Sequence, residues 1–202
     1  MNEVMDGATG LPGIILFWLW WVFLTFLEAA TRDQDTRDQT QPTQAMADTV
    51  IEYGTTDTGI AKIRRFDPSF DLDMFVYGAR HAYEIIVSAF AAGDLDRLEP
   101  LVSEEILAVF AEHCAARASR GECVDLALIG IESIDIVQID VCEASMEVTL
   151  CFNAQMIWVE RSAEGLTVSG NPAEIIDVVE AWTFARPLPV VSNSWELIST
   201  GD

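Results

Sequence analysis

The N-terminal part of the chain contains an apolar run that few water-soluble folds can accommodate. Residues 11–27 read LPGIILFWLWWVFLTFL and include no charged side chain. With residues 28–30 the run approaches the roughly 20 residues that cross a hydrocarbon core about 30 Å thick. A helix that is apolar on all sides is buried in protein or lipid, whereas a helix lying in the membrane surface needs a charged face. The sequence therefore predicts one transmembrane helix over residues 11–30.

The flanks of this run distinguish an anchor from a cleaved signal peptide. It is preceded by MNEVMDG, which has no basic residue, whereas a cleavable signal peptide begins with a positively charged segment. Arg32 and Arg37 follow the run, so the positive-inside rule places the remainder of the chain in the cytoplasm. We expect residues 1–30 to be an uncleaved signal anchor, with these side chains in the membrane: Ile14, Leu16, Trp18, Trp21, Leu24 and Leu27.

A polar segment follows the predicted anchor. Residues 31–65 are rich in Thr, Gln and Asp and show neither a helical nor a strand period. Such a segment buries too little surface to offset its ordering entropy, so we predict a flexible linker. Its end carries Lys62, Arg64 and Arg65, which are candidate contacts for anionic lipid. The alternative interpretation is that these residues are an ordinary linker end.

The remaining residues, 66–202, are strongly acidic. They contain 24 acidic and 6 basic side chains, a net charge of −18, within a chain of net charge −22. Such a surface repels phosphates, which argues against a nucleic-acid partner. Two interpretations of the acidity stay open: it keeps the protein soluble, or it faces a partner with a basic surface.

The pattern of apolar residues in this part predicts helices followed by strands. Asp71 or Asp73 can cap a helix that ends at Gly93, and Ser103 can cap another that ends by Gly121. The period then falls to about two, and the predicted strands are VDLALIGI, SIDIVQIDV, ASMEVTLCFNAQMIWVE, DVVEAWTFARPL and WELIST. Helices followed by meandering strands predict an α+β domain, with the helices packed on one face of an antiparallel sheet.

Several ordered stretches of residues 66–202 resemble the Tim44-like domain family. The resemblance lies in FDPSFDLDMFVYGARHAYEIIVSAFAAGDLDRLEPLVSEEILAVF, in GNPAEIIDVVEAWTFARP and in NSWELIST. It implies a nuclear-transport-factor-two-like (cystatin-like) cone, in which a curved antiparallel sheet wraps over helices and leaves an apolar concavity. Asn171 departs from the aspartate that is usual in the family's G-D-P turn, and SNSW replaces the usual D-P-N-W.

The resemblance also implies a function. Bacterial members of the family carry one N-terminal membrane span and are adaptors, and a mitochondrial relative tethers a chaperone to an import channel. The chain would then be a single-pass adaptor of the bacterial inner membrane that holds a soluble protein partner there. A ribosome- or lipid-docking factor on the same scaffold, and a cone that binds a small molecule or a lipid acyl chain, are the alternatives.

The sequence contains no G-x-S-x-G, H-E-x-x-H, P-loop or G-x-G-x-x-G motif, so we expect no enzyme, metal or cofactor. Strand alternation puts Glu180, Trp182, Phe184 and Arg186 on one face, which makes them the candidate partner or cavity residues. Glu180 would suit a general base if it is half-buried. The interpretation we favour is that it pairs with Arg186 or Arg161 on an exposed sheet face.

Overall fold

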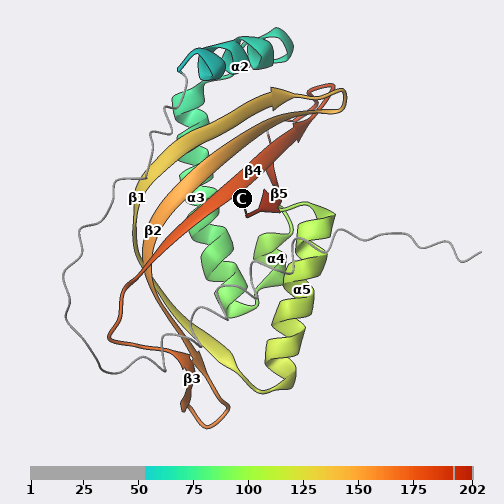
Figure 1. The fold of residues 1–202 in the computed structure, drawn as a ribbon. Coiled ribbons are helices and arrows are strands. Elements are labelled where there is room, and N and C mark those ends of the chain that lie inside the picture. The colour runs from blue at the N-terminus through green and yellow to red at the C-terminus, as the bar shows by residue number, and fades with distance from the viewer. Residues whose placement is uncertain (1–52, 193, 202) are drawn as a thin grey trace, which may run out of the picture. The chain divides into compact units, whose positions relative to one another are not determined.

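The computed structural model describes residues 53–192 and 194–201, all within one compact unit, Pro42–Asp202. Within these residues four helices come first and five strands follow (Figure 1). The helices are α2 (Tyr53–Phe66), α3 (Leu72–Ala92), α4 (Leu95–Leu98) and α5 (Glu104–Ser119). The strands are β1 (Cys123–Val141), β2 (Ser145–Arg161), β3 (Thr167–Gly170), β4 (Ile176–Pro187) and β5 (Glu196–Thr200). The predicted α+β class, with helices on a curved antiparallel sheet, is confirmed.

Local capping signals set the ends of the two long helices. Asp71 is the N-cap of α3, and its side chain accepts a hydrogen bond from the amide of Met74 at 3.0 Å. The same helix ends at Gly93, whose φ of 72° is a left-handed conformation that glycine adopts without strain. Ser103 caps α5, with two glutamates in the first turn where the helix dipole favours negative charge.

Helix α2 corrects the predicted linker. Residues 53–65 belong to a helix, whereas the sequence predicted no regular structure there. The helix packs against β1: Ile63 is fully buried, and a Cβ added at Gly59 would lie 2.6 Å from the Cβ of Ile139. Its order therefore comes from tertiary packing rather than from a strong local pattern. The other part of the predicted linker, residues 31–52, lies outside the described residues.

The sheet has the order β1-β2-β4-β5, and β3 pairs with the end of β2. All of these pairings are antiparallel. Strand β1 joins two stretches that the sequence suggested were separate strands, and its register with β2 shifts at three places. Such bulges bend a strand and increase its twist, which fits the curvature in Figure 1. The pairing of β2 with β4 has no register shift over its whole length.

The helices cover the inner, concave face of the sheet. Alternate residues of β2 from Met146 to Met156 are buried against α3 and its neighbours, whereas the residues between them face the other side. The largest fully buried side chains include Tyr83 of α3 and Phe152 of β2, whose rings stack with centroids 4.6 Å apart. The core of the domain therefore lies between α3 and the inner face of β2 and β4.

None of the helices in residues 53–192 and 194–201 has the length and apolar character needed to cross a bilayer. The predicted anchor, residues 1–30, lies outside the described residues. Its topology therefore stays a prediction.

Candidate functional site

A buried ion pair joins the start of the domain to its fourth strand. Asp67, directly after α2, accepts a hydrogen bond from Nη1 of Arg186 on β4 at 3.0 Å. The two side chains are only 8% and 5% exposed. Asp67 also accepts hydrogen bonds from the hydroxyl and amide of Ser69. These bonds, with the nearby guanidinium, hold the pKa of Asp67 below its usual range against the opposing effect of burial.

Aromatic rings from the three stretches that carry the family resemblance surround this pair. Phe75 of α3 meets Trp195 at 4.8 Å and Phe184 of β4 at 6.1 Å between ring centroids. Phe70 lies 5.9 Å from both Phe75 and Trp195. The guanidinium of Arg186 stands over the Trp195 ring at 5.9 Å. We call these six residues the motif cluster: Asp67, Phe70, Phe75, Phe184, Arg186 and Trp195. These contacts join residues 67–75, near the start of the domain, to residues 184–195, near its C-terminal end.

This geometry corrects what we expected of three candidate partner residues. Trp182 and Phe184 are 3% and 2% exposed, and Arg186 is committed to Asp67. Helix α3 covers them: Tyr83 lies 4.6 Å from the Trp182 ring. The predicted shared face is present, but it is the packed interior of the domain rather than an open mouth.

Glu180 is the fourth candidate on this face, and its setting is unusual. It is half-buried opposite Phe152, and it accepts a hydrogen bond from Nε1 of Trp182 at 2.9 Å. Burial raises the pKa of Glu180, and the bond from Trp182 offsets this only in part. The hydroxyl of Tyr83 is buried with no hydrogen-bond partner among the described residues. Burial, and secondarily the charge of Glu180, raise the pKa of Tyr83.

The ion pair that we favoured for Glu180 was wrong. Arg186 bonds to Asp67, and Arg161 pairs with Asp125 across β1 and β2. No described Lys, Arg or His forms an ion pair with Glu180. The carboxyl therefore faces inward without a cation, which is a costly position for a charged group.

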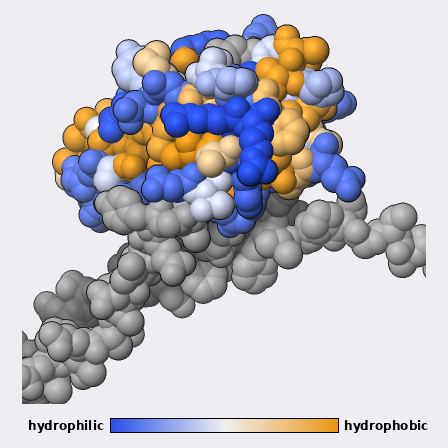
Figure 2. All heavy atoms as spheres, turned by 90° about the horizontal axis from the view of Figure 1, so that it is seen from above, coloured by the Kyte–Doolittle hydropathy of each residue, from blue (hydrophilic) through white to orange (hydrophobic). Residues whose placement is uncertain are grey.

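The candidate lipid-contact residues lie on α2. Lys62, Arg64 and Arg65 are all exposed, and Nε of Arg64 donates to the carbonyl of Phe70 at 3.1 Å. A pocket of about 730 Å³ lies between α2 and the start of α3 and includes both arginines. Its lining also includes three carboxylates, from Asp57, Asp71 and Asp73. Figure 2 looks down on this end, where hydrophilic side chains cross a hydrophobic surface.

These features can be compared with known proteins. The model of the Tim44-like domain matches residues 56–202. The chain belongs to the Tim44-like family. Its relatives include the mitochondrial import inner membrane translocase subunit TIM44 of Homo sapiens and that of Rattus norvegicus. Each is 23% identical over 128 residues, which is 63% of this chain and 28% of the relative. The chain therefore spans little more than a quarter of their length.

The Tim44-like domain is also similar to solved structures of other proteins. One of them is the crystal structure of the intermembrane space region of the chloroplast protein ARC6, with a TM-score of 0.43 and 15% identity. The match covers 66% of this chain and 97% of that chain.

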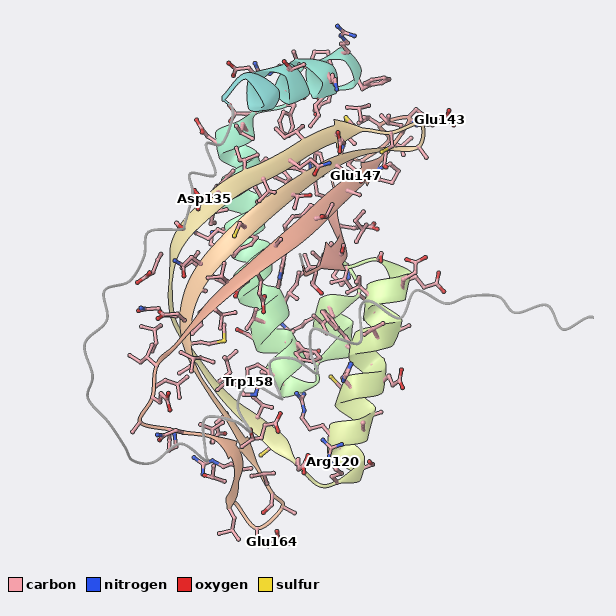
Figure 3. All side chains as sticks on the ribbon, viewed as in Figure 1. Arg120, Asp135, Glu143, Glu147, Trp158 and Glu164 are labelled. Carbon is pink, nitrogen blue, oxygen red and sulfur yellow. The ribbon has the colours of Figure 1, made fainter. Side chains whose placement is uncertain are left out.

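A second pocket of the Tim44-like domain lies on the outer face of the sheet and was not predicted. It has a volume of about 310 Å³ and is lined by carboxylates of β1 and β2 and by hydroxyl groups of β2, β4 and β5. Glu147, labelled in Figure 3, is one of these carboxylates, and the hydroxyls of Thr149 and Thr183 are 2.9 Å apart. Neither pocket is lined by Glu180. The sequence signal for the outer pocket is only the polar half of a strand alternation, which most exposed sheet faces share.

Proposed function

We propose that this chain is a membrane-anchored adaptor that holds a soluble protein partner at the bacterial inner membrane. The observation that carries the proposal is the Tim44-like match over residues 56–202, since the matched relatives are named as subunits of an inner-membrane translocase. The apolar run of residues 11–27 ahead of the match supplies the anchor. In this proposal the domain is a nuclear-transport-factor-two-like cone that faces the cytoplasm.

The mechanism of such an adaptor is an increase in local concentration. A partner bound to a domain that is fixed near the membrane meets a membrane complex as if both were in one small volume, at millimolar effective concentration for a short flexible link. No bond needs to be made or broken in this mechanism. What the domain must supply is a surface that recognises the partner.

Two measurements on native membranes test the proposal. The full chain is expected to resist a carbonate wash, and chemical crosslinking followed by mass spectrometry is expected to recover one protein above background. A variant with residues 11–27 deleted is the control, and it should lose both the membrane association and the crosslinked partner. If the full chain is released by carbonate, or the same partner is recovered by the deletion variant, the anchored-adaptor proposal fails.

Direct docking to anionic lipid is a second candidate, favoured by the exposure of Lys62, Arg64 and Arg65 on one helix. The three carboxylates in the neighbouring pocket oppose it, because they outnumber the two arginines there. The test inserts the full chain into vesicles containing phosphatidylglycerol. The comparison is a variant in which the three basic residues are glutamine. Because the anchor inserts in either case, protection of α2 from protease is the readout. Equal cleavage of both proteins, at low and high salt, would exclude lipid docking.

A further inference from the structure

The first four residues of strand β4, Ile176–Val179, have one edge to which no described strand is paired. On one side it pairs with β2, but β5 pairs only with Trp182–Ala185. The amide of Gly201 donates to the carbonyl of Ala181, so odd-numbered residues of β4 direct their backbone groups away from β2. By this alternation the amides and carbonyls of Asp177 and Val179 also point away, and they have no backbone partner among the described residues. We call this side of Ile176–Val179 the β4 free edge.

The side chains around the β4 free edge are apolar and exposed. Val179 is 60% exposed and Ile175, just before the strand, is 52% exposed. On the inner side Ile176 and Val178 are only half-buried against the core. An exposed apolar strand with unpaired backbone groups is a template for another strand, and proteins usually protect such an edge with a bulge, a proline or a cover. No bulge or proline lies within Ile176–Val179, and no described strand pairs with its free side.

The charges at this edge specify which strand fits. Glu180 faces inward at the end of the edge and forms no ion pair with a described residue, and Asp177 is exposed on the outer side. A second copy of this chain would bring its own acidic residues against them, which is repulsive in a protein of net charge −22. A strand with a basic residue opposite Glu180 would instead supply the missing cation. We propose that the β4 free edge binds an extended segment of a partner protein in which basic and apolar residues are combined.

This inference rests on the proposed function, since it names the surface by which the adaptor recognises its partner. In the added strand, backbone groups would bond to Asp177 and Val179, and an apolar side chain would cover Val179. An arginine or lysine beside Glu180 would donate hydrogen bonds to its carboxylate and form an ion pair with it at this half-buried position. The backbone bonds provide affinity, and the pairing with Glu180 provides selectivity for basic segments.

The test uses a defined probe, a fluorescent nonapeptide with the central sequence Arg-Val-Val-Lys-Val flanked by threonines, and the full chain in detergent micelles. A peptide with glutamine in place of both basic residues is the matched control. The basic peptide is expected to bind about tenfold more tightly than the control, as one charge-assisted contact would give. It should also slow hydrogen exchange at the amides of Asp177 and Val179. The substitution Glu180→Gln should remove the preference for the basic peptide.

Two further probes separate edge binding from other contacts. Val179→Pro removes an amide that points to the free side and should abolish binding, with circular dichroism confirming that the fold is kept. Because a proline could still distort β4, two peptides methylated on alternate backbone amides provide an independent check. Only one of the two methylated peptides should bind, because an added strand presents alternate amides to β4.

Several results would overturn the proposal. One is slower hydrogen exchange on β1 instead of β4, and another is slower exchange at Asp177 and Val179 that depends on protein concentration alone. Equal binding of the two methylated peptides, or of the basic and glutamine peptides, would also overturn it. The membrane crosslink distinguishes this inference from the adaptor function. If Val179→Pro and Glu180→Gln recover the same partner as the unmodified chain, the edge proposal fails and the adaptor stands. If the peptides bind as expected but no crosslinked partner is recovered, the adaptor proposal fails and the edge stands.

Discussion

Strand β1 and residues 176–179 of β4 each have one side to which no described strand is paired, but the two edges differ in their protection. Strand β1 has three register shifts along its pairing with β2. Helix α2 packs against the C-terminal end of β1, at Ile139. Arg80 of α3 donates two hydrogen bonds to the carbonyl of Ile131 in its middle. Residues 176–179 of β4 pair with β2 without a register shift, and no described strand is paired to their free side. Register shifts and contacts with α2 and α3 thus protect the edge of β1. At the β4 free edge, only the acidic side chains restrict which strand can pair.

The largest effect is expected from the ion pair of Asp67 and Arg186. Asp67 follows directly after α2, the helix that packs against β1. Asp67→Asn removes the charge of one partner from a buried ion pair with Arg186, so the free energy of unfolding should fall by about 3–5 kcal/mol at pH 7. Urea denaturation measures this, and hydrogen exchange should show faster opening of β1 near Ile139. The pKa of Asp67 is lowered in the folded state, so its contribution is present above the ordinary aspartate range and is lost as the pH falls.

A matched substitution controls for the loss of a carboxylate at this end of the domain. Asp71→Asn changes the N-cap of α3, where asparagine caps as well as aspartate. It should change stability by less than about 0.5 kcal/mol. A loss as large as that of Asp67→Asn would mean that the buried pair has no special role.

The next effect tests whether contact with α2 protects β1. In Gly59→Ala the new methyl group would lie 2.6 Å from the Cβ of Ile139, so α2 must move or the strand must yield. We expect a loss of about 1–3 kcal/mol in the free energy of unfolding, as overpacking usually costs. Hydrogen exchange at the end of β1 should become faster, while exchange at Asp177 and Val179 stays the same.

Gly78→Ala provides the control for this change, because it is also a glycine in a helix. Apart from its chain neighbours and the backbone of its own helix, no described atom lies within 4 Å of a Cβ added at Gly78. Alanine should therefore stabilise α3 by about 0.5–1 kcal/mol through its helix propensity. If both substitutions had the same sign, the contact between α2 and β1 would not be limiting.

A smaller effect concerns the carboxyl beside the β4 free edge. Burial raises the pKa of Glu180 in the folded state, so the folded protein loses stability as the pH rises through and above the ordinary glutamate range. Glu180→Gln has no charge to bury, so it should be more stable than the unmodified chain at pH 7, on the order of 1 kcal/mol. The difference should shrink toward pH 4. A variant less stable at pH 7 would show that the carboxylate has a favourable partner.

The smallest effect is expected at the N-terminal end of β1, near Asp125. Asp125 pairs with Arg161 of β2, and their side chains are 59% and 31% exposed to solvent. Asp125→Asn should cost less than about 1 kcal/mol, because water and salt screen such pairs. Thermal denaturation at low and high salt checks this, and a large, salt-independent loss would show that this pair also protects the edge.

How far the sequence predicts this fold depends on how local the signals are. The ends of α3 were predicted because Asp71 and Gly93 act on their own helix. Helix α2 was missed because its main support, Gly59 against Ile139, comes from a strand about 80 residues later in the chain. The two stretches of β1 looked separate because bulges interrupt the alternation that marks a strand.

The candidate site shows the same division. Strand alternation predicted correctly that Glu180, Trp182, Phe184 and Arg186 share a face. It did not predict that the face is covered, because α3 is brought there by the tertiary fold. The pair of Asp67 and Arg186, 119 residues apart, has no local signature, although both lie in stretches that carry the family resemblance. The β4 free edge depends on where β5 stops pairing, which no pattern within β4 records.

The motif cluster has a mechanical consequence. Tension applied to the chain ahead of Tyr53 would reach the domain through α2 and then Asp67. From there a buried bond passes the load to Arg186 on β4, inside the sheet, and aromatic rings on both sides share it. A domain loaded at its interior yields as one body rather than by peeling strand by strand. An attachment point of this kind places the load on the packed core of the domain.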